Sequence, residues 1–392
     1  MSKKKMLSPL RLPSQANWIR HNELKDASDN QPYNGAEYPL YSDVGVVGEI
    51  SDGLGPYKIL NAFPCSQGSE ADISIILRAF IHDAPYQYTR TPLKTDSSRF
   101  HGGNFEEEIA SLISLSLGIR LKAGEANRYF NPNDPLGRFR AFKFNSTPSL
   151  SINLKRPMIP MPERVNMTEA APFLATIPHI EPNIYIELVR AARTYQGALW
   201  ISESDPHLAW LLFVSSLEIA ANADLTTTGS TLENFKTLKP SLALTIQEAG
   251  GDLLLTHIAE EFKGVFGSTR KFLLFCEKHM PTAPNIRPLD ESRISWIWTD
   301  LQPVLNKIYS LRSQALHAGI PFPAPMCRPP SIGFQDKHPA EKAITSLAEG
   351  TMSSNWIPKD APIALHTFQY FARGALLNWW QKLPAASSHF CS

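Results

Sequence analysis

The stretch that decides the fold of the C-terminal half is residues 290–319, DESRISWIWTDLQPVLNKIYSLRSQALHAG. Its apolar residues recur every three or four positions, which is the spacing of one buried helix face. They are Ile294, Ile297, Leu301, Leu305, Ile308 and Leu311. We expect a long helix that opens at Asp290 or Ser292, is kinked or split by Pro303, and ends at Gly319.

The same helical period extends in both directions from this stretch. One amphipathic helix is predicted from residue 183, and a more apolar one follows Asp205-Pro206, where a capping residue precedes a proline. Further helices are expected over residues 253–266, 272–279, 339–349 and 363–381. The pattern therefore predicts an all-α bundle over residues 183–382, with a short tail at 383–392.

The N-terminal part has a different pattern. Short β-rich runs over residues 44–50, 57–63 and 73–77 are broken by glycine and proline and are typical of strands. A helix is expected after Asn104, because three glutamates fill its first turn. We predict a mixed α/β domain over residues 37–145, preceded by a loose polar segment at 1–36.

Seven prolines fall between residues 146 and 182, and proline removes backbone donors. We expect this segment to be a linker between the two domains. The predicted fold class is α+β overall, with an N-terminal mixed α/β domain followed by an all-α helical bundle.

Composition narrows the classes of function. The 392 residues carry a net charge of +1, so any nucleic-acid contact needs a local basic patch. The four widely spaced cysteines suggest no disulfide framework and fit a reducing cytoplasm. No run of about 18 apolar residues predicts a membrane span, and we expect no membrane partner. No glycine-rich phosphate loop occurs, and Cys276 lacks further metal ligands at suitable spacing, so we expect no cofactor and no metal.

Arg312 and His317 form the candidate chemical centre. Four residues separate them at the end of the long helix, just before Gly319. An imidazole titrates near neutral pH and can move a proton. A guanidinium stays charged and offers a planar fork of donors to phosphate oxygens. This combination favours chemistry on a phosphodiester.

For several other side chains the sequence allows both a functional role and a structural role. Glu218 interrupts an apolar helix and either pairs with Arg312 or faces solvent. Tyr309 stacks on a base or packs in the core, one turn from Arg312. For Lys271 and its neighbour Arg270, the two alternatives are that they line a path for RNA or that they are solvated surface charges. Three further histidines are expected to be structural: His257, His279 and His366.

The segment 308–319, IYSLRSQALHAG, resembles the RxxxxH motif of HEPN domains, especially the Apea-like branch of bacterial defence proteins. Residues 195–199, YQGAL, and 211–219, LLFVSSLEI, resemble the helices that precede the motif in that family. Residues 101–110, HGGNFEEEIA, resemble segments that precede such domains. The resemblance covers about residues 183–382.

The resemblance implies a metal-independent endoribonuclease that cleaves RNA by attack of a 2′-hydroxyl. Arg312 and His317 would be the catalytic residues, supported by Glu218, Ser313 and Tyr309. Active members often carry Asn, Asp or His where Ser313 stands. HEPN domains pair, so a homodimer with two motif copies in one cleft is expected.

The biological role implied is an RNase effector of an antiphage or toxin system (abortive infection). Its substrate would be RNA, with transfer RNA as one example, and the N-terminal domain would sense a phage-derived or protein trigger. The alternative is a non-catalytic HEPN-type module for dimerisation or for binding a nucleotide or RNA.

Overall fold

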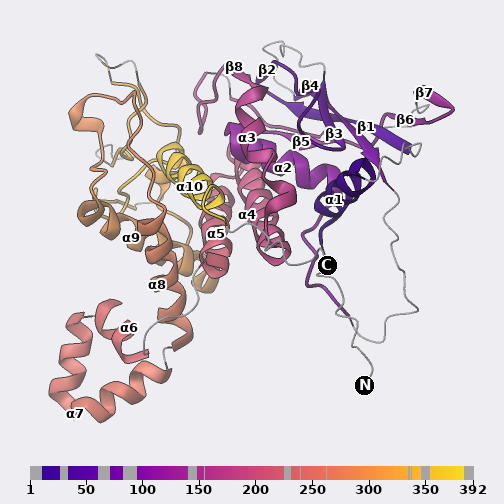
Figure 1. The fold of residues 1–392 in the computed structure, drawn as a ribbon. Helices are drawn as coiled ribbons and strands as arrows, with labels where there is room; N and C mark the ends of the chain where they lie inside the picture. The colour runs from indigo at the N-terminus through magenta and orange to yellow at the C-terminus, as the bar shows by residue number, and fades with distance from the viewer. Residues whose placement is uncertain are drawn as a thin grey trace, which may run out of the picture. The chain divides into compact units, whose positions relative to one another are not determined.

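The computed structural model describes residues 11–26, 34–60, 71–82, 95–139, 148–153, 155–224, 231–238, 240–261, 263–333, 336, 338–345 and 354–383. The chain divides into two compact units (Figure 1). One unit comprises residues 1–204 and 380–392, and the other comprises residues 205–379. The first contains the strands and the second is helical, which confirms the predicted α+β class.

An antiparallel sheet organises the first unit. Its path runs β3 (Tyr57–Leu60), β4 (Asp72–Ile81), β1 (Asn34–Ser42), β6 (Arg128–Asn131) and β7 (Asp134–Phe139). A sixth strand, β5 (Lys122–Ala123), also pairs with β1. A separate parallel pair joins β2 (Gly45–Val47) to β8 (Arg164–Asn166). The strands expected near residues 44, 57 and 73 are present, while β6 and β7 were not predicted.

Helix α2 (Phe105–Leu117) is the central helix of this unit and is buried along almost its whole length. A helix that is apolar on most sides is stable only when neighbours cover it. It contacts α1 (Pro13–Asp26) and α4 (Pro182–Ile201). The helix stops at Gly118, whose φ of 72° allows the left-handed turn that ends it.

The described part of segment 1–36, residues 11–26 and 34–36, is not loose as predicted, because it contains helix α1 and the start of β1. Trp18 is buried and meets the ring of Tyr57 edge-on, with centroids 5.8 Å apart. Gln15 donates to the carbonyls of Ile177 and Ile180. The helix is held by one aromatic anchor and by buried polar contacts, so its sequence has no apolar stripe for a periodicity argument to detect.

The predicted linker at 146–182 is also folded. It contains β8, the short helix α3 (Ala171–Leu174), and two 3-10 turns at Met167–Ala170 and Ile177–His179. Prolines occupy first-turn positions, where their missing N–H is not needed. The division between the units therefore falls after Ser204, and α4 belongs with the sheet.

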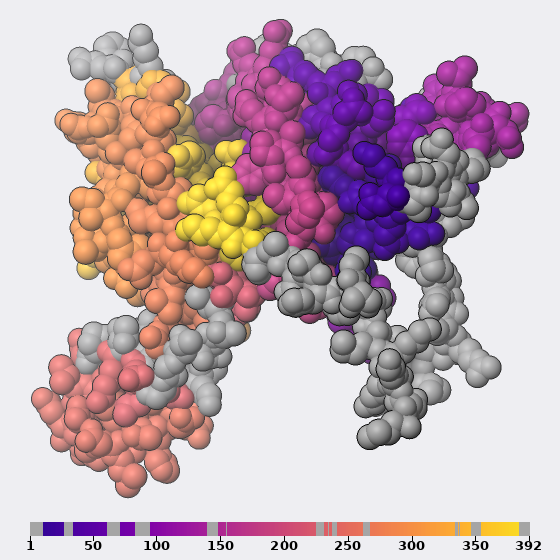
Figure 2. Space-filling view, in the orientation of Figure 1, coloured from indigo at the N-terminus to yellow at the C-terminus, as the bar shows by residue number. Residues whose placement is uncertain are grey.

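The described part of the second unit contains six longer helices: α5 (Pro206–Asp224), α6 (Thr231–Leu238), α7 (Pro240–Glu261), α8 (Lys263–Lys278), α9 (Trp298–Ala318) and α10 (Leu365–Trp380). Helices α5, α8 and α9 contact one another pairwise. Helices α6 and α7 form a hairpin around a small core of their own that includes Phe235 and Leu255 (Figures 1 and 2).

Several helix boundaries differ from the prediction. Helix α9 begins at Trp298 and continues through Pro303 without being split. Pro303 lies near the start of the helix, and its missing N–H leaves only the carbonyl of Thr299 without a helical donor. Residues 339–345 are not helical, and Pro339 instead bridges Ile332. The remaining residues of that expected helix lie outside the described part of the chain.

Candidate functional site

Helix α9 carries the motif arginine at the wall of a cavity. Its apolar positions Leu301, Leu305 and Ile308 are buried, and the helix ends at Gly319, whose φ is 67°. Burial of that face fixes the rotation of the helix, so Arg312 is turned toward α5 and its side chain is 20% exposed. Packing of the buried face of α9 therefore determines where the Arg312 side chain lies.

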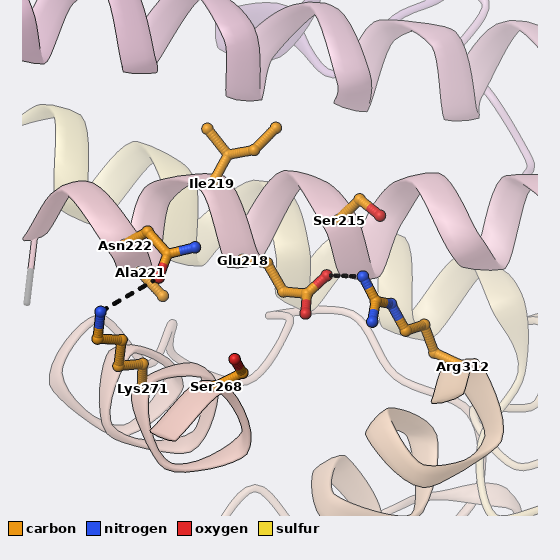
Figure 3. Close-up of a pocket in the computed structure, with 8 residues that line it drawn as sticks. All are labelled: Ser215, Glu218, Ile219, Ala221, Asn222, Ser268, Lys271 and Arg312. Carbon is orange, nitrogen blue, oxygen red and sulfur yellow. Dashed lines mark hydrogen bonds and ion pairs between the residues drawn. The ribbon is translucent and has the colours of Figure 1, made fainter. Parts of the chain in front are cut away.

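Glu218 of α5 is the partner of Arg312. The carboxylate Oε2 lies 2.5 Å from Nη2 of Arg312 and forms an ion pair with it (Figure 3). The other oxygen, Oε1, accepts a hydrogen bond of 2.8 Å from the hydroxyl of Tyr309. Of the two alternatives for Glu218, the pairing with Arg312 is the one present, and Glu218 does not simply face solvent.

Tyr309 contacts both members of the ion pair. It lies one turn before Arg312 on α9, and the guanidinium carbon is 5.8 Å from the centre of its ring. Its ring also contacts Phe272, with centroids 5.0 Å apart. Burial and the negative charge of Glu218 raise the pKa of Tyr309. The tyrosine is a packed hydrogen-bond donor here, which is the core reading of this residue.

A polar cavity of about 320 Å³ opens beside the ion pair. Three helices contribute to its wall: α5, α8 and α9. The lining residues are Ser215, Glu218, Ile219, Ala221, Asn222, Ser268, Lys271 and Arg312 (Figure 3). Lys271 donates to the side-chain oxygen of Asn222 over 3.4 Å, so two cations, Lys271 and Arg312, face the same space.

The guanidinium of Arg312 retains donor capacity. Among the described residues, its Nε is buried and has no hydrogen-bond partner. A buried polar group without a partner is costly, and this nitrogen meets a ligand oxygen only after the guanidinium moves. Because Arg312 and Lys271 both line the cavity, their two positive charges can attract an anionic oxygen there.

His317 lies at the exposed end of α9, outside the lining of this cavity. Five positions on a helix correspond to a rotation of about 140° from Arg312, so the two side chains of one chain do not share a face. Two large apolar side chains, Leu316 and Ile320, flank the histidine and are half exposed. Ser313 is half-buried beside Arg312 and is not part of the cavity lining.

The other histidines and the central cysteine do not join this site. His279 is buried and contacts Asp224, whereas His257 is exposed on α7. Burial lowers the pKa of His366 to about 4. Cys276 is buried, and burial raises the pKa of its thiol. Within the described ranges, no three His, Cys, Asp or Glu side chains are grouped so as to hold a metal ion.

Sequence reasoning found Arg312 and Glu218 but missed the remaining wall of the cavity. Lys271, for which the sequence left open an RNA-lining role or a solvated surface charge, lines the cavity together with Ser268 of the same helix. Their spacing of three residues places both on one face of α8. That spacing was the only available signal, and it does not say which face meets α5.

Comparison with known proteins gave no match to any family model, and no similar protein was found among curated sequences or solved structures. No helix in the described part of the chain has the length and apolar character needed to cross a membrane.

Proposed function

We propose that this chain is a metal-independent endoribonuclease of HEPN type, with Arg312 and His317 as its catalytic residues. One observation carries the proposal. The guanidinium of Arg312 lines a polar cavity together with Lys271, while the motif histidine is exposed at the end of the same helix. These positions support a phosphate-binding role for Arg312 and a proton-transfer role for His317.

The chemistry follows from these residue types. An imidazole removes the proton from a ribose 2′-hydroxyl, and the 2′-oxygen attacks the adjacent phosphorus. Arg312 stabilises the charge that grows on the non-bridging phosphate oxygens. The bond to the 5′-oxygen breaks, and that oxygen takes a proton from a second acid. The products are a 2′,3′-cyclic phosphate and a 5′-hydroxyl end.

This reaction needs both a base and an acid, and the motif provides one histidine per chain. Two copies related by a two-fold axis would bring both motif histidines to one cleft. The exposed Leu316 and Ile320 beside His317 support such a contact, because exposed apolar side chains are favourable when a second copy covers them. We therefore place the composite site at a homodimer seam.

The substrate class is single-stranded RNA, such as a transfer RNA loop, because unpaired bases and backbone are accessible there. The enzyme would act as the effector of an antiphage or toxin system in the cytoplasm. Its first unit, built around the sheet, would sense the trigger. Ser313 and Tyr309 support the site through their places beside Arg312.

The test uses the purified full chain and labelled RNA in the presence of a chelator. Wild-type protein should cleave the RNA and leave 2′,3′-cyclic phosphate ends. His317→Ala and Arg312→Ala should each lower the rate by at least 100-fold. His257→Ala, at an exposed position of α7, is the matched control and should cleave normally. Equal cleavage by His317→Ala would rule out the catalytic assignment.

A non-catalytic module is the second candidate, and one observation favours it. Glu218 neutralises Arg312 in the structure, as expected for a residue that holds an interface or a fold together. Under this reading the wild-type chain binds RNA or a nucleotide and leaves RNA intact, both with and without divalent metal.

A further inference from the structure

A second cavity lies in the first unit and is lined by residues of α1, the start of α2, strand β1, the segment leading into β6, and β6 itself. Figure 1 shows where these elements lie. Its volume is about 590 Å³, within the usual range for small-molecule sites. The lining residues are Pro13, Tyr38, Gly103, Asn104, Phe105, Glu106, Glu125, Ala126 and Tyr129.

The ionisable side chains that line this cavity are acidic. Two carboxylates, Glu106 and Glu125, are the ionisable acids of its wall, and the described lining includes no Lys, Arg or His. Glu125 is exposed at the rim, whereas Glu106 is only 9% exposed. Two negative charges of this kind repel an anion, even though a helix begins here.

Glu106 differs from the two glutamates that follow it. Glu107 forms an ion pair of 2.7 Å with Arg193, and Glu108 contacts His101 at 2.8 Å. Among the described residues, no basic side chain lies within ion-pair distance of Glu106. Its oxygen accepts a hydrogen bond of 3.1 Å from the side chain of Asn104, which orients the carboxylate without neutralising it.

Burial accordingly raises the pKa of Glu106, since its charge is removed from water without a compensating cation. The wall of the cavity thus holds a preoriented carboxylate that a positive group would stabilise.

Aromatic rings complete the wall. Tyr38 and Phe105 meet edge-on with centroids 5.2 Å apart, and Tyr129 is 49% exposed at the rim. The faces of such rings attract ammonium and guanidinium groups within about 6 Å. Carboxylate and aromatic side chains around one cavity are the combination that selects organic cations over neutral or anionic ligands.

We propose that this cavity of the first unit binds an organic cation through its ammonium or guanidinium group, with Glu106 as the charged partner and Tyr129 as the covering ring. The site is separate from the Arg312 cavity and does not depend on the proposed nuclease activity. The cation comes either from a free polyamine or from a basic side chain of a peptide, and the chemistry at Glu106 is the same for both.

Binding to the full chain is measured by titration calorimetry with spermidine and with N-acetyl-arginine amide. N-acetyl-citrulline amide, which has the same shape without the charge, is the ligand control. At least one cation should bind, and the citrulline compound should bind at least ten-fold more weakly. Preference for spermidine identifies a polyamine site, and preference for the arginine compound identifies a peptide side chain.

Glu106→Gln keeps the shape and the hydrogen-bond acceptor and should weaken cation binding about ten- to 100-fold. Glu125→Gln, at the exposed rim, should weaken it several-fold and does not threaten the fold. Glu169→Gln, an exposed glutamate away from the cavity lining, is the matched control and should bind normally. The proposal is overturned if neither cation binds, if the citrulline compound binds equally, or if both cavity variants bind as the wild type does.

Discussion

Arg312 of α9 and Glu218 of α5 are joined by an ion pair of 2.5 Å, although 93 residues separate them in the sequence. The same carboxylate accepts the hydroxyl of Tyr309, so one side chain of α5 holds two successive turns of α9. The carboxylate of Glu218 and a bound phosphate would therefore compete for the guanidinium of Arg312.

This pair should contribute measurably to stability. The side chains are 20% and 15% exposed, so their charges are only partly screened by water. Arg312→Met and Glu218→Gln should each lower the free energy of unfolding by about 1–3 kcal/mol in urea titrations. The double variant should lose about 1 kcal/mol less than the sum of the two, because the singles share one interaction. Strict additivity would show that the pair contributes no coupling.

Lys271 should act on RNA binding and not on the chemical step. Lys271→Ala should weaken RNA binding several-fold and reduce the slope of log affinity against log salt by about 1, since one phosphate contact is lost. Fluorescence anisotropy in a His317→Ala background measures binding without cleavage. Lys236→Ala, at an exposed position of α6, is the matched control. An equal loss of RNA affinity in both variants would show that the RNA does not bind at the Arg312 cavity.

The half-exposed apolar residues beside His317 should hold the proposed dimer. Leu316→Asp should convert the protein to a monomer at micromolar concentration, because a carboxylate cannot be buried there without a partner. RNA cleavage should fall with the dimer, while the thermal midpoint of the monomer stays within a few degrees. Sedimentation velocity measures the mass, and Ile286→Asp is the control at another exposed apolar position. A monomeric variant with full activity would contradict the composite site.

The first unit should lose stability in mild acid. His82 accepts or donates a hydrogen bond of 2.9 Å with His21, and burial lowers the pKa of His82 to about 4, with the charges of His21 and Arg20 acting in the same direction. Burial and the nearby charge of Lys25 also lower the pKa of His21.

The unfolded chain binds the proton near pH 6.5 and the folded chain only near pH 4. The stabilising effect is therefore complete above pH 6.5 and is lost as the pH falls toward 4. Urea titrations at pH 7.5 and pH 5 should show a smaller loss for His82→Gln than for the wild type. An equal acid loss in both would assign the effect to other groups.

Part of the helical half, above all α9, could be predicted because the apolar period and the end signal lie within one segment of the sequence. The apolar period of residues 301–311 identified α9, and Gly319 marked its end through a backbone conformation that glycine adopts at low cost. The α+β class followed from the change of period along the chain. The ion pair of Glu218 with Arg312 was one of two alternatives that the sequence left open, because a carboxylate in an apolar helix either needs a partner or faces solvent.

Tertiary structure alone decided the rest. Helix α1 is held by Trp18 and by buried polar contacts, and the proline-rich segment folds onto α2, so neither has a periodic pattern. Lys271 reaches the Arg312 cavity only because α8 turns that face toward α5. The physical reason is that periodicity records which side of one element is buried, whereas a cavity depends on how separate elements face each other, and no single segment encodes that orientation.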